Sequence, residues 1–583
     1  MNIKLFILYF LALSSTNLAI GQQVTSSSIS VSPVPNEAAY LDVNSSLFFV
    51  GEYLYYKIYV KNTATNQLTS LSKIGYVELI QEDGKTVFKQ QLVLENGISQ
   101  GDFFIPTDVV SGNYKIVGYT QNMLVKSDEN FFQQDIGIIN PYRGDQTAIS
   151  ELKTEDSDTL TIKNISEETS KDYDFTIHLD KNKYSNRSAV NLSLSTESKN
   201  IKNGTYSLSV RKKNEIDVPQ LKTSLNYRIK QNNPNVKEGT TRSILPELRG
   251  KLISGKIVST NPNQSVKGKK VTLSIPGDDY VFKVSDVAEN GNFYFNIDKP
   301  HSQNKALFQV IGDTEDNFNI QLDSLPSINK ASLKFNKFTI TPQMQKMIEE
   351  RSIHNQIENA YYHVKPDTIK TKPLEKAYYG KTFTTYVLDE YTRFPTMKET
   401  MIEIVENAWL QTNSDGRSKF VVREPEGYGR TNNPLLLLVD GVFLQSHDLL
   451  ANFKAAKVES ISVLRDRYYL GSQTFQGVMI VQTKDNDFNK YLDEDFILQT
   501  QLLPDQPVKS YFSQEYNAFN ESKTTHIPDY RRQLLWQPHI KMEEGEMGIK
   551  FFTSDISGNF EVRLEGFMVD GSPVSFVKTF TVE

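Results

Sequence analysis

The feature that most constrains this chain is a series of short segments in which apolar and polar residues alternate, each ended by a turn signal. Residues 54–60, 75–80 and 114–119 show this pattern, and Asp83-Gly84 and Asn96-Gly97 lie between them. A period of two is typical of a strand with one buried face, and such glycine pairs are typical of hairpin turns. Because 583 residues exceed what one hydrophobic core organises, we expect several β-sandwich domains in series.

The composition supports folded cores and removes several classes of function. Hydrophobic residues make up 38% of the chain and aromatic residues 11%, which is enough apolar material for packed domains. The 64 basic and 70 acidic side chains leave a net charge of -6, so no overall positive field would attract nucleic acid. Cysteine is absent, which excludes disulfides, cysteine nucleophiles, thiolate zinc sites and thioester-based protease traps.

The N-terminal residues are typical of an export signal. Lys4 precedes an apolar run over residues 5–13, and small residues then lead to Gly21. The run is shorter than the ~20 residues that cross a bilayer, and no later segment is long enough, which disfavours an uncleaved membrane helix. We expect a signal peptide at residues 1–21, a Ser-rich leader at 22–45, and a periplasmic chain, peripheral to the outer membrane, without a transmembrane segment of its own.

The first sandwich is predicted at residues 46–140. Its phrases at 50–52, 101–106 and 111–120 resemble the macroglobulin-like domains found in envelope proteins of the Bacteroidetes. After a polar and acidic stretch, a second set of alternations predicts another β-sandwich, macroglobulin-like as well, at 157–216.

Two different parts follow these sandwiches. Residues 245–325 resemble a carboxypeptidase-regulatory-type sandwich, with an Asn290-Gly291 turn before alternating aromatic residues. Such modules are not peptidases, so the resemblance implies a structural role. Residues 341–361 predict a connector helix, because Thr341 suits the N-cap and Pro342 the first helical position. The helix has an apolar stripe that we expect to pack in a core rather than form a partner groove, made of Met344, Met347, Ile348 and Ile357.

A small α+β unit is predicted near the C-terminal end. Residues 434–442 form a continuous apolar run that ends in an Asp440-Gly441 turn, which predicts a strand buried on both faces at the centre of a sheet. Residues 457–464 and 477–484 predict two more strands, and residues 397–405 predict a helix before them.

These segments, in this order, are similar to the plug domain of TonB-dependent outer-membrane receptors. The similarity spans residues 386–484 within a predicted domain at 380–485, and the phrases at 389–397 and 528–536 resemble barrel-less members of the same Bacteroidetes set. A receptor barrel needs ~22 strands of about ten residues, and the residues after Lys484 are too few. We expect a β-sandwich module at 536–583 instead.

No catalytic, cofactor-binding or metal-binding residues are predicted, so we expect a protein that is not an enzyme. The seven histidines form no HExxH or HxH spacing, no G-x-S-x-G elbow occurs, and Glu375 replaces the first glycine that a phosphate loop ending at Gly380-Lys381-Thr382 would need. His447-Asp448 is interpreted as a pair of exposed turn residues. Residues 485–495 alternate acidic side chains as a calcium loop does, but Lys490 stands at the glycine position, which favours a solvated linker and leaves calcium open.

A plug without its own barrel implies a binding function. The resemblance implies a periplasmic protein that binds an outer-membrane channel made by another polypeptide and plugs or scaffolds it, with the type 9 protein-secretion translocon as the specific candidate. The alternative is a steric macroglobulin-like protease inhibitor or an accessory module of a nutrient-uptake complex. Tight turns with aromatic and Arg side chains are typical contact material, and the predicted partner-binding residues are Asp440, Gly441, Arg465, Tyr468, Tyr469 and Gly471.

Overall fold

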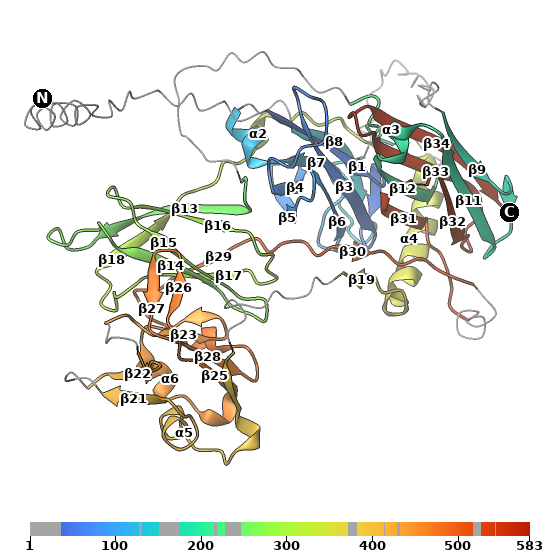
Figure 1. The fold of residues 1–583 in the computed structure, drawn as a ribbon. Helices are drawn as coiled ribbons and strands as arrows, with labels where there is room; N and C mark the ends of the chain where they lie inside the picture. The colour runs from blue at the N-terminus through green and yellow to red at the C-terminus, as the bar shows by residue number, and fades with distance from the viewer. Residues whose placement is uncertain are drawn as a thin grey trace, which may run out of the picture. The chain divides into compact units, whose positions relative to one another are not determined.

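The structure is a computed structural model, drawn as a ribbon in Figure 1. It describes residues 36–126, 131–150, 174–214, 218–227, 247–370, 382–412, 414, 416–427, 432–516, 526–542 and 544–583. The predicted signal peptide, most of the predicted leader and the start of the predicted second sandwich, 157–173, lie outside these residues. Within them, strands in several separate sheets predominate, so the predicted fold class, mainly β and multidomain, is confirmed. No helix in these ranges is long and apolar enough to span a bilayer.

The first sandwich consists of two sheets with the strand orders β1-β3-β6 and β2-β8-β7-β4-β5. Phe48, Tyr56, Ile116 and Phe132 are fully buried in the core between them. β1 is buried throughout although it lies within the range predicted as leader, so this sandwich begins earlier than predicted. Its elements are β1 (Glu37–Val43), β2 (Leu47–Phe49), β3 (Tyr53–Asn62), β4 (Ile74–Gln81), β5 (Thr86–Val93), β6 (Ile98–Phe104), β7 (Gly112–Tyr119), α2 (Gln121–Lys126) and β8 (Phe132–Ile139).

The second sandwich is built from two distant parts of the chain. Its sheets have the orders β10-β34-β33-β12-β31 and β32-β11-β9, and Val210 of β12 pairs with both Leu535 and Val562. The prediction of separate modules at 157–216 and 536–583 is therefore wrong, because alternation does not reveal which strands pair. The elements are β9 (Phe175–Leu179), β10 (Lys183–Tyr184), β11 (Ala189–Thr196), α3 (Lys199–Lys202), β12 (Thr205–Lys212), β31 (Gln533–Ile540), β32 (Glu546–Phe552), β33 (Gly558–Phe567) and β34 (Pro573–Val582).

The third sandwich occupies the region predicted to be regulatory-type and has the sheets β16-β13-β18 and β15-β14-β17-β29. β29 comes from much later in the chain, and its Leu498 pairs with Phe308 of β17. The domain predicted at residues 380–485, called the plug-like unit, therefore lies between two strands of this sandwich in the chain. The sequence did not reveal this insertion. The elements are β13 (Lys251–Ser259), β14 (Lys270–Ile275), β15 (Val281–Asp286), β16 (Asn292–Ile297), β17 (Lys305–Val310), β18 (Phe318–Leu322) and β29 (Leu498–Gln501).

The predicted connector helix is confirmed as α4, Gln345–Ala360, which follows the 3-10 turn η2, Pro342–Met344. The predicted packing of the apolar stripe is confirmed in part, because Met347 and Ile348 pack against a core cluster that contains Leu47 and Phe49, but the most buried residues of the helix are polar. Arg351, Ser352 and Asn355 are the buried residues of α4, whereas the apolar side chains of the stripe that lie within the helix are only partly buried. Between α4 and the plug-like unit, the short strand β19 (Thr368–Ile369) pairs with β30 (Lys509–Ser510).

The plug-like unit contains a sheet of order β20-β25-β28-β23-β24. The three predicted strands are confirmed as β23, β25 and β28, but the central strand is β28 rather than β23. The predicted helix at 397–405 is confirmed as α5 and ends slightly earlier. The elements are β20 (Thr384–Val387), α5 (Met397–Glu403), β21 (Ala408–Thr412), β22 (Ser418–Val422), β23 (Leu436–Val439), β24 (Val442–Phe443), α6 (His447–Ala451), β25 (Val458–Leu464), β26 (Tyr468–Leu470), β27 (Gln473–Phe475) and β28 (Val478–Thr483).

Both faces of the plug-like sheet are covered within the chain. Leu437 and Val439 of β23 join the cluster that contains the buried side chains of α5 and α6. Leu436 and Leu438 point to the other face and meet Phe282 and other side chains of the third sandwich. This explains why the run is apolar without alternation, as predicted for a strand buried on both faces.

Candidate functional site

Asp440 and Gly441, predicted to contact a partner, lie in an internal contact. Asp440 is 1% exposed, and its carboxylate accepts hydrogen bonds from the backbone N–H groups of Thr483 at 2.7 Å and Phe488 at 3.0 Å. Gly441 has a φ of 80°, and a Cβ at this position would lie 2.2 Å from the Cβ of Tyr280 in the third sandwich. Their role as partner-contact residues is therefore not supported, because both hold the plug-like unit together or against its neighbour.

The other four predicted residues surround the β26–β27 hairpin. Arg465 donates to the backbone carbonyls of Arg423 at 2.9 Å and Glu424 at 3.1 Å, and Tyr468 is partly buried. Tyr469 is 59% exposed, and Gly471 borders open space. Tyr469 and Gly471 at the hairpin tip are thus the most exposed residues of the predicted set, and their contact with a partner stays a prediction.

His447 and Asp448 were expected to be exposed turn residues, but they position β22. His447 Nδ1 accepts the N–H of Phe420 at 2.9 Å, and Asp448 accepts the N–H of Ser418 at 2.8 Å. Burial, followed by the charge of Lys419, lowers the pKa of His447 to about 4. The imidazole is therefore a neutral acceptor at neutral pH, and the pair has a structural role.

Ile402 and Trp409 are among the large apolar side chains that the plug-like unit exposes, and neither was predicted to contact a partner. Ile402 of α5 is 65% exposed and Trp409 of β21 is 41% exposed, and these two elements pack against each other. No hydrogen bond or ion pair among the described residues joins α5 or β21 to the third sandwich. We call these two side chains and their elements the α5–β21 surface. The sequence offers one signal for this surface, because Ile402 lies beside charged residues in the predicted helix.

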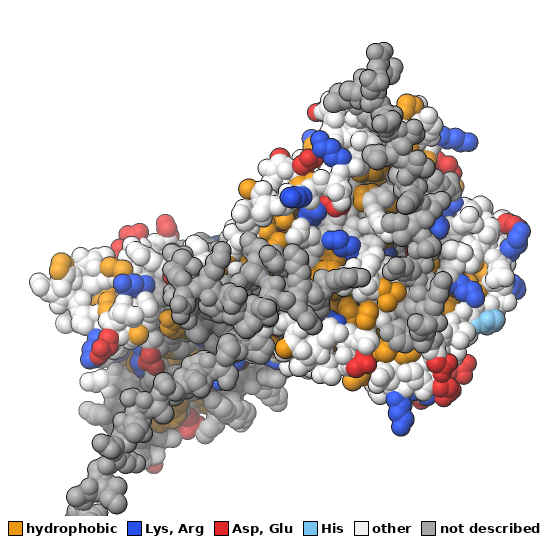
Figure 2. Space-filling model, turned by 90° about the horizontal axis from the view of Figure 1, so that it is seen from above, with side chains coloured by type: hydrophobic (Ala, Val, Ile, Leu, Met, Phe, Trp, Pro, Cys, Tyr) orange, Lys and Arg blue, Asp and Glu red, His pale blue; other side chains and the backbone are white. Residues whose placement is uncertain are grey.

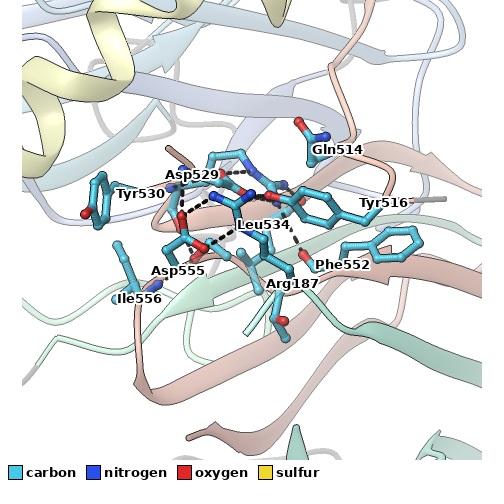
Figure 3. Close-up of polar contacts among 12 residues, drawn as sticks. Arg187, Gln514, Tyr516, Asp529, Tyr530, Leu534, Phe552, Asp555 and Ile556 are labelled. Carbon is cyan, nitrogen blue, oxygen red and sulfur yellow. Dashed lines mark hydrogen bonds and ion pairs between the residues drawn. The ribbon is translucent and has the colours of Figure 1, made fainter. Parts of the chain in front are cut away.

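A dense polar cluster lies around Asp529, within the segment at 528–536 that resembles barrel-less plug proteins. Figure 3 shows its hydrogen bonds and ion pairs. Arg531 donates from Nε and Nη2 to the two Asp529 carboxylate oxygens, each at 2.6 Å, and the Tyr516 hydroxyl donates to the same carboxylate at 2.6 Å. Burial alone would raise the pKa of Asp529, but Arg531 outweighs it and the pKa falls to about 2.

A second bidentate pair fixes the cluster to the second sandwich. Arg187 donates from Nε and Nη2 to Asp555, each at 2.6 Å, and Asp555 also accepts the backbone N–H of Asp529 at 2.9 Å (Figure 3). Lys365 lies 2.7 Å from Glu358 of α4 and 3.6 Å from Asp529. Charge-assisted pairs of this geometry are strong and directional, so the cluster connects α4 to the second sandwich.

Helix α4 is held on the first sandwich by a polar face. Arg351, which is 1% exposed, donates from Nε and Nη2 to the two carboxylate oxygens of Glu52, each at 2.7 Å. Asn355 and Asn359 donate to the backbone carbonyls of Val50 at 2.6 Å and Gly51 at 3.0 Å. The sequence analysis missed these residues, although the spacing of four between Arg351, Asn355 and Asn359 places them on one helix face.

Two cavities adjoin these clusters. One, of about 160 Å³, lies between the first sandwich, α4, β12 and the segment after Asp529, and the other, of about 460 Å³, lies beside residues 512–516 and 527–529. The residues that line the first cavity are Asn44, Gly51, Glu52, Tyr53, Tyr55, Arg211, Arg351, His354, Asn355, Glu358, Asn359, Tyr362, Lys365, Asp367, Phe512, Tyr530, Arg531, Arg532 and Gln533.

The paired charges suit binding better than proton transfer. Asp529, with a pKa of about 2, stays ionised at neutral pH, while a general base works best with a pKa near the operating pH. No group of three or more His, Cys, Asp or Glu side chains in the described residues could hold a metal ion, and this includes residues 485–495. On the face in Figure 2, Lys and Arg side chains are interspersed with Asp and Glu side chains, without a large field of one sign.

Comparisons with known proteins give only distant similarities. No family model matches the chain, and no curated protein matches it. Among solved structures, the chain is similar to an Escherichia coli alpha-2-macroglobulin activated by porcine elastase, with 10% identity, a TM-score of 0.22, and coverage of 94% of this chain and 44% of the other. A Salmonella alpha-2-macroglobulin mutant has 9% identity, a TM-score of 0.23 and coverage of 94% and 40%. The chain thus spans less than half the length of these neighbours, and TM-scores this low carry no argument about function.

Proposed function

We propose that this chain is a non-enzymatic periplasmic protein that binds an outer-membrane channel formed by another polypeptide and plugs or scaffolds it. The type 9 protein-secretion translocon is the specific channel that we propose, because such a pore needs a periplasmic seal when no cargo passes. The basis of this proposal is the resemblance of residues 386–484 to receptor plugs.

The arrangement of the plug-like unit favours docking at the mouth of a channel. Its sheet is covered by α5 and α6 on one face and by the third sandwich on the other. A receptor-like plug that enters a pore would have to carry this sandwich with it. Binding from outside the opening, with the rest of the chain remaining in the periplasm, avoids that requirement.

The observation that supports this proposal most directly is the α5–β21 surface. Ile402 is 65% exposed and Trp409 is 41% exposed on elements that make no polar contact with the third sandwich among the described residues. Large apolar and aromatic side chains that stay exposed beside charged groups are typical of protein contact sites, and Trp is enriched among the residues that dominate binding. We therefore place the channel contact on this surface.

Site-specific cross-linking in intact envelopes tests the assignment. A photoreactive amino acid replaces Trp409 in one full-length variant and Tyr294 in a control, because Tyr294 of β16 is 48% exposed on the third sandwich, outside the plug-like unit. We expect the probe at Trp409 to link the chain to an outer-membrane barrel protein and the probe at Tyr294 to give no such product. Equal products at both positions, or linkage at Trp409 to a soluble protease, would overturn the proposal.

A further inference from the structure

The cavity of about 160 Å³ beside α4 has the size of a site for one small organic group. An apolar cavity of ~150 Å³ admits benzene, so this one could hold a ring or a single amino-acid residue but not a folded segment. Its walls come from the first sandwich, α4, β12 and residues 530–533, parts of the chain that are far apart in sequence. The cavity is therefore a product of how these parts pack together.

Cationic side chains outnumber carboxylates among the described residues that line the cavity. The cations are Arg211, Arg351, Lys365, Arg531 and Arg532, and the carboxylates are Glu52, Glu358 and Asp367. Arg351 is paired with Glu52, Lys365 with Glu358, and Arg531 with Asp529 behind the wall. Asp367 accepts the backbone N–H of Phe512 at 2.9 Å. Arg211 makes no ion pair with a carboxylate among the described residues.

Arg211 of β12 has a hydrogen-bonding group that the described residues leave unused. Its Nη1 donates to the backbone carbonyl of Asn44 at 3.3 Å, while its Nε is buried and has no hydrogen-bond partner among the described residues. Because solvent does not reach this Nε, a ligand in the cavity would have to use the Nη2 group, which makes no hydrogen bond among the described residues. Burial, followed by the charge of Arg351, lowers the pKa of Arg211 to about 9, which an anion nearby would reverse.

The same cavity has aromatic walls. His354 and Tyr530 stack with centroids 4.2 Å apart, and Tyr53 stacks on Tyr362 with centroids 5.5 Å apart. All four residues line the cavity, as do Tyr55 and Phe512. The faces of these rings favour a ligand with a carbon skeleton over a fully hydrated inorganic anion, because a ring face is apolar and offers no hydrogen-bond donor.

We propose that this cavity binds a small organic carboxylate, with the carboxylate group on Arg211 and the hydrocarbon part against the aromatic walls. A free carboxylic acid and the C-terminal residue of a peptide share this chemistry. The site is independent of the α5–β21 surface, since none of its lining residues belongs to the plug-like unit.

Calorimetric titration of the full chain with four probes tests the proposal. Benzoate represents a free acid, N-acetyl-phenylalanine a peptide C-terminus, N-acetyl-phenylalanine amide the same group without the carboxylate, and inorganic phosphate an anion without a carbon skeleton. We expect at least one of the two carboxylates to bind at least tenfold more tightly than the amide and phosphate. Tighter binding of benzoate indicates a free acid, and tighter binding of N-acetyl-phenylalanine indicates a peptide end.

Variants connect the binding to Arg211. Arg211→Gln should weaken carboxylate binding at least tenfold, whereas Arg249→Gln, at an exposed arginine that does not line the cavity, should leave it unchanged. If Arg211→Gln does not fold, Arg211→Lys keeps the charge but loses the planar donor fork, and it should also bind more weakly. Binding of the amide or phosphate as tight as that of the acids, carboxylate binding unaffected by these variants, or no binding of any probe would overturn the proposal.

Discussion

At the residue scale, ionisable side chains lie buried where the first and second sandwiches meet. Asp42 of β1 accepts from Arg563 of β33 at 2.7 Å, and Glu565 accepts from the backbone N–H of Ser224 at 3.0 Å. Burial raises the pKa of Glu565 to about 7, and the charge of Arg563 opposes this rise. Burial also lowers the pKa of Lys57 to about 7. Folding therefore changes the proton uptake of this interface near neutral pH.

The Glu565→Gln variant should flatten the pH dependence of stability. The pKa of the Glu565 carboxyl group is about 7 in the folded state and ~4.3 in the unfolded state. Its contribution to stability is therefore complete below pH ~4.3 and is lost as the pH rises through 7. The loss is on the order of 3 kcal/mol, so wild-type protein should lose more stability between pH 5 and pH 8 than the variant. Urea unfolding at both pH values measures this difference.

Glu459→Gln, at an exposed position of β25, is the control for that comparison and should follow the wild type. The same loss of stability between pH 5 and pH 8 in the Glu565→Gln variant and the wild type would contradict the assigned role of Glu565.

At the element scale, α5 shows which features local sequence can specify. The Thr396 side chain accepts the backbone N–H of Glu399 at 3.4 Å, and the Glu399 carboxylate accepts the backbone N–H of Thr396 at 3.1 Å, which is a capping box. All of these groups lie within four positions of one another. The start of this helix could be predicted for that reason.

Replacing the cap should destabilise the plug-like unit without changing its fold. Thr396→Ala leaves the N–H of Glu399 without its side-chain acceptor and should lower the free energy of unfolding by about 1 kcal/mol. Thr392→Ala, at an exposed position four residues earlier, should change it by less than about 0.5 kcal/mol. Urea unfolding of both variants gives the comparison, and equal effects would show that the cap contributes nothing specific.

Helix α4 shows the opposite case at this scale. Its position was predicted from Thr341 and Pro342, but its polar buried face was not, because burial was assigned to the apolar stripe alone. The residues that are buried include Arg351 and Asn355, whose acceptors lie on the loop after β2. A helix pattern reveals the residues that share a face, but the identity of the packing surface depends on a different part of the chain.

At the scale of the whole molecule, the chain passes twice through two of its sandwiches. Gln533 of β31 and Val210 of β12 share a hydrogen bond although they are 323 positions apart. β29 likewise returns to the third sandwich after the plug-like unit. In both sandwiches, the earlier strands therefore pair with strands that are synthesised much later.

Truncation of the chain before Gln533 should therefore unfold strands that lie in its N-terminal half. The shortened chain lacks β31 and β33, which are the two neighbours of β12, so the backbone N–H groups of β12 should lose their protection from hydrogen exchange. β13 and β16 of the third sandwich pair only with each other and β18, and they should keep their protection. Unchanged protection of β12 would contradict this architecture.

The sequence by itself determined the features whose causes are local. Alternation with a period of two located strands such as those at residues 54–60, 75–80 and 114–119, and turn pairs such as Asn96-Gly97 marked the breaks between strands. Only the tertiary structure decided that two predicted modules form one sandwich, that Asp440 and Gly441 face inward, and that Arg211 borders a cavity. These features depend on contacts between residues that lie tens to hundreds of positions apart, and the energy of such a contact is set by the surfaces that meet rather than by the neighbours of either residue in the chain.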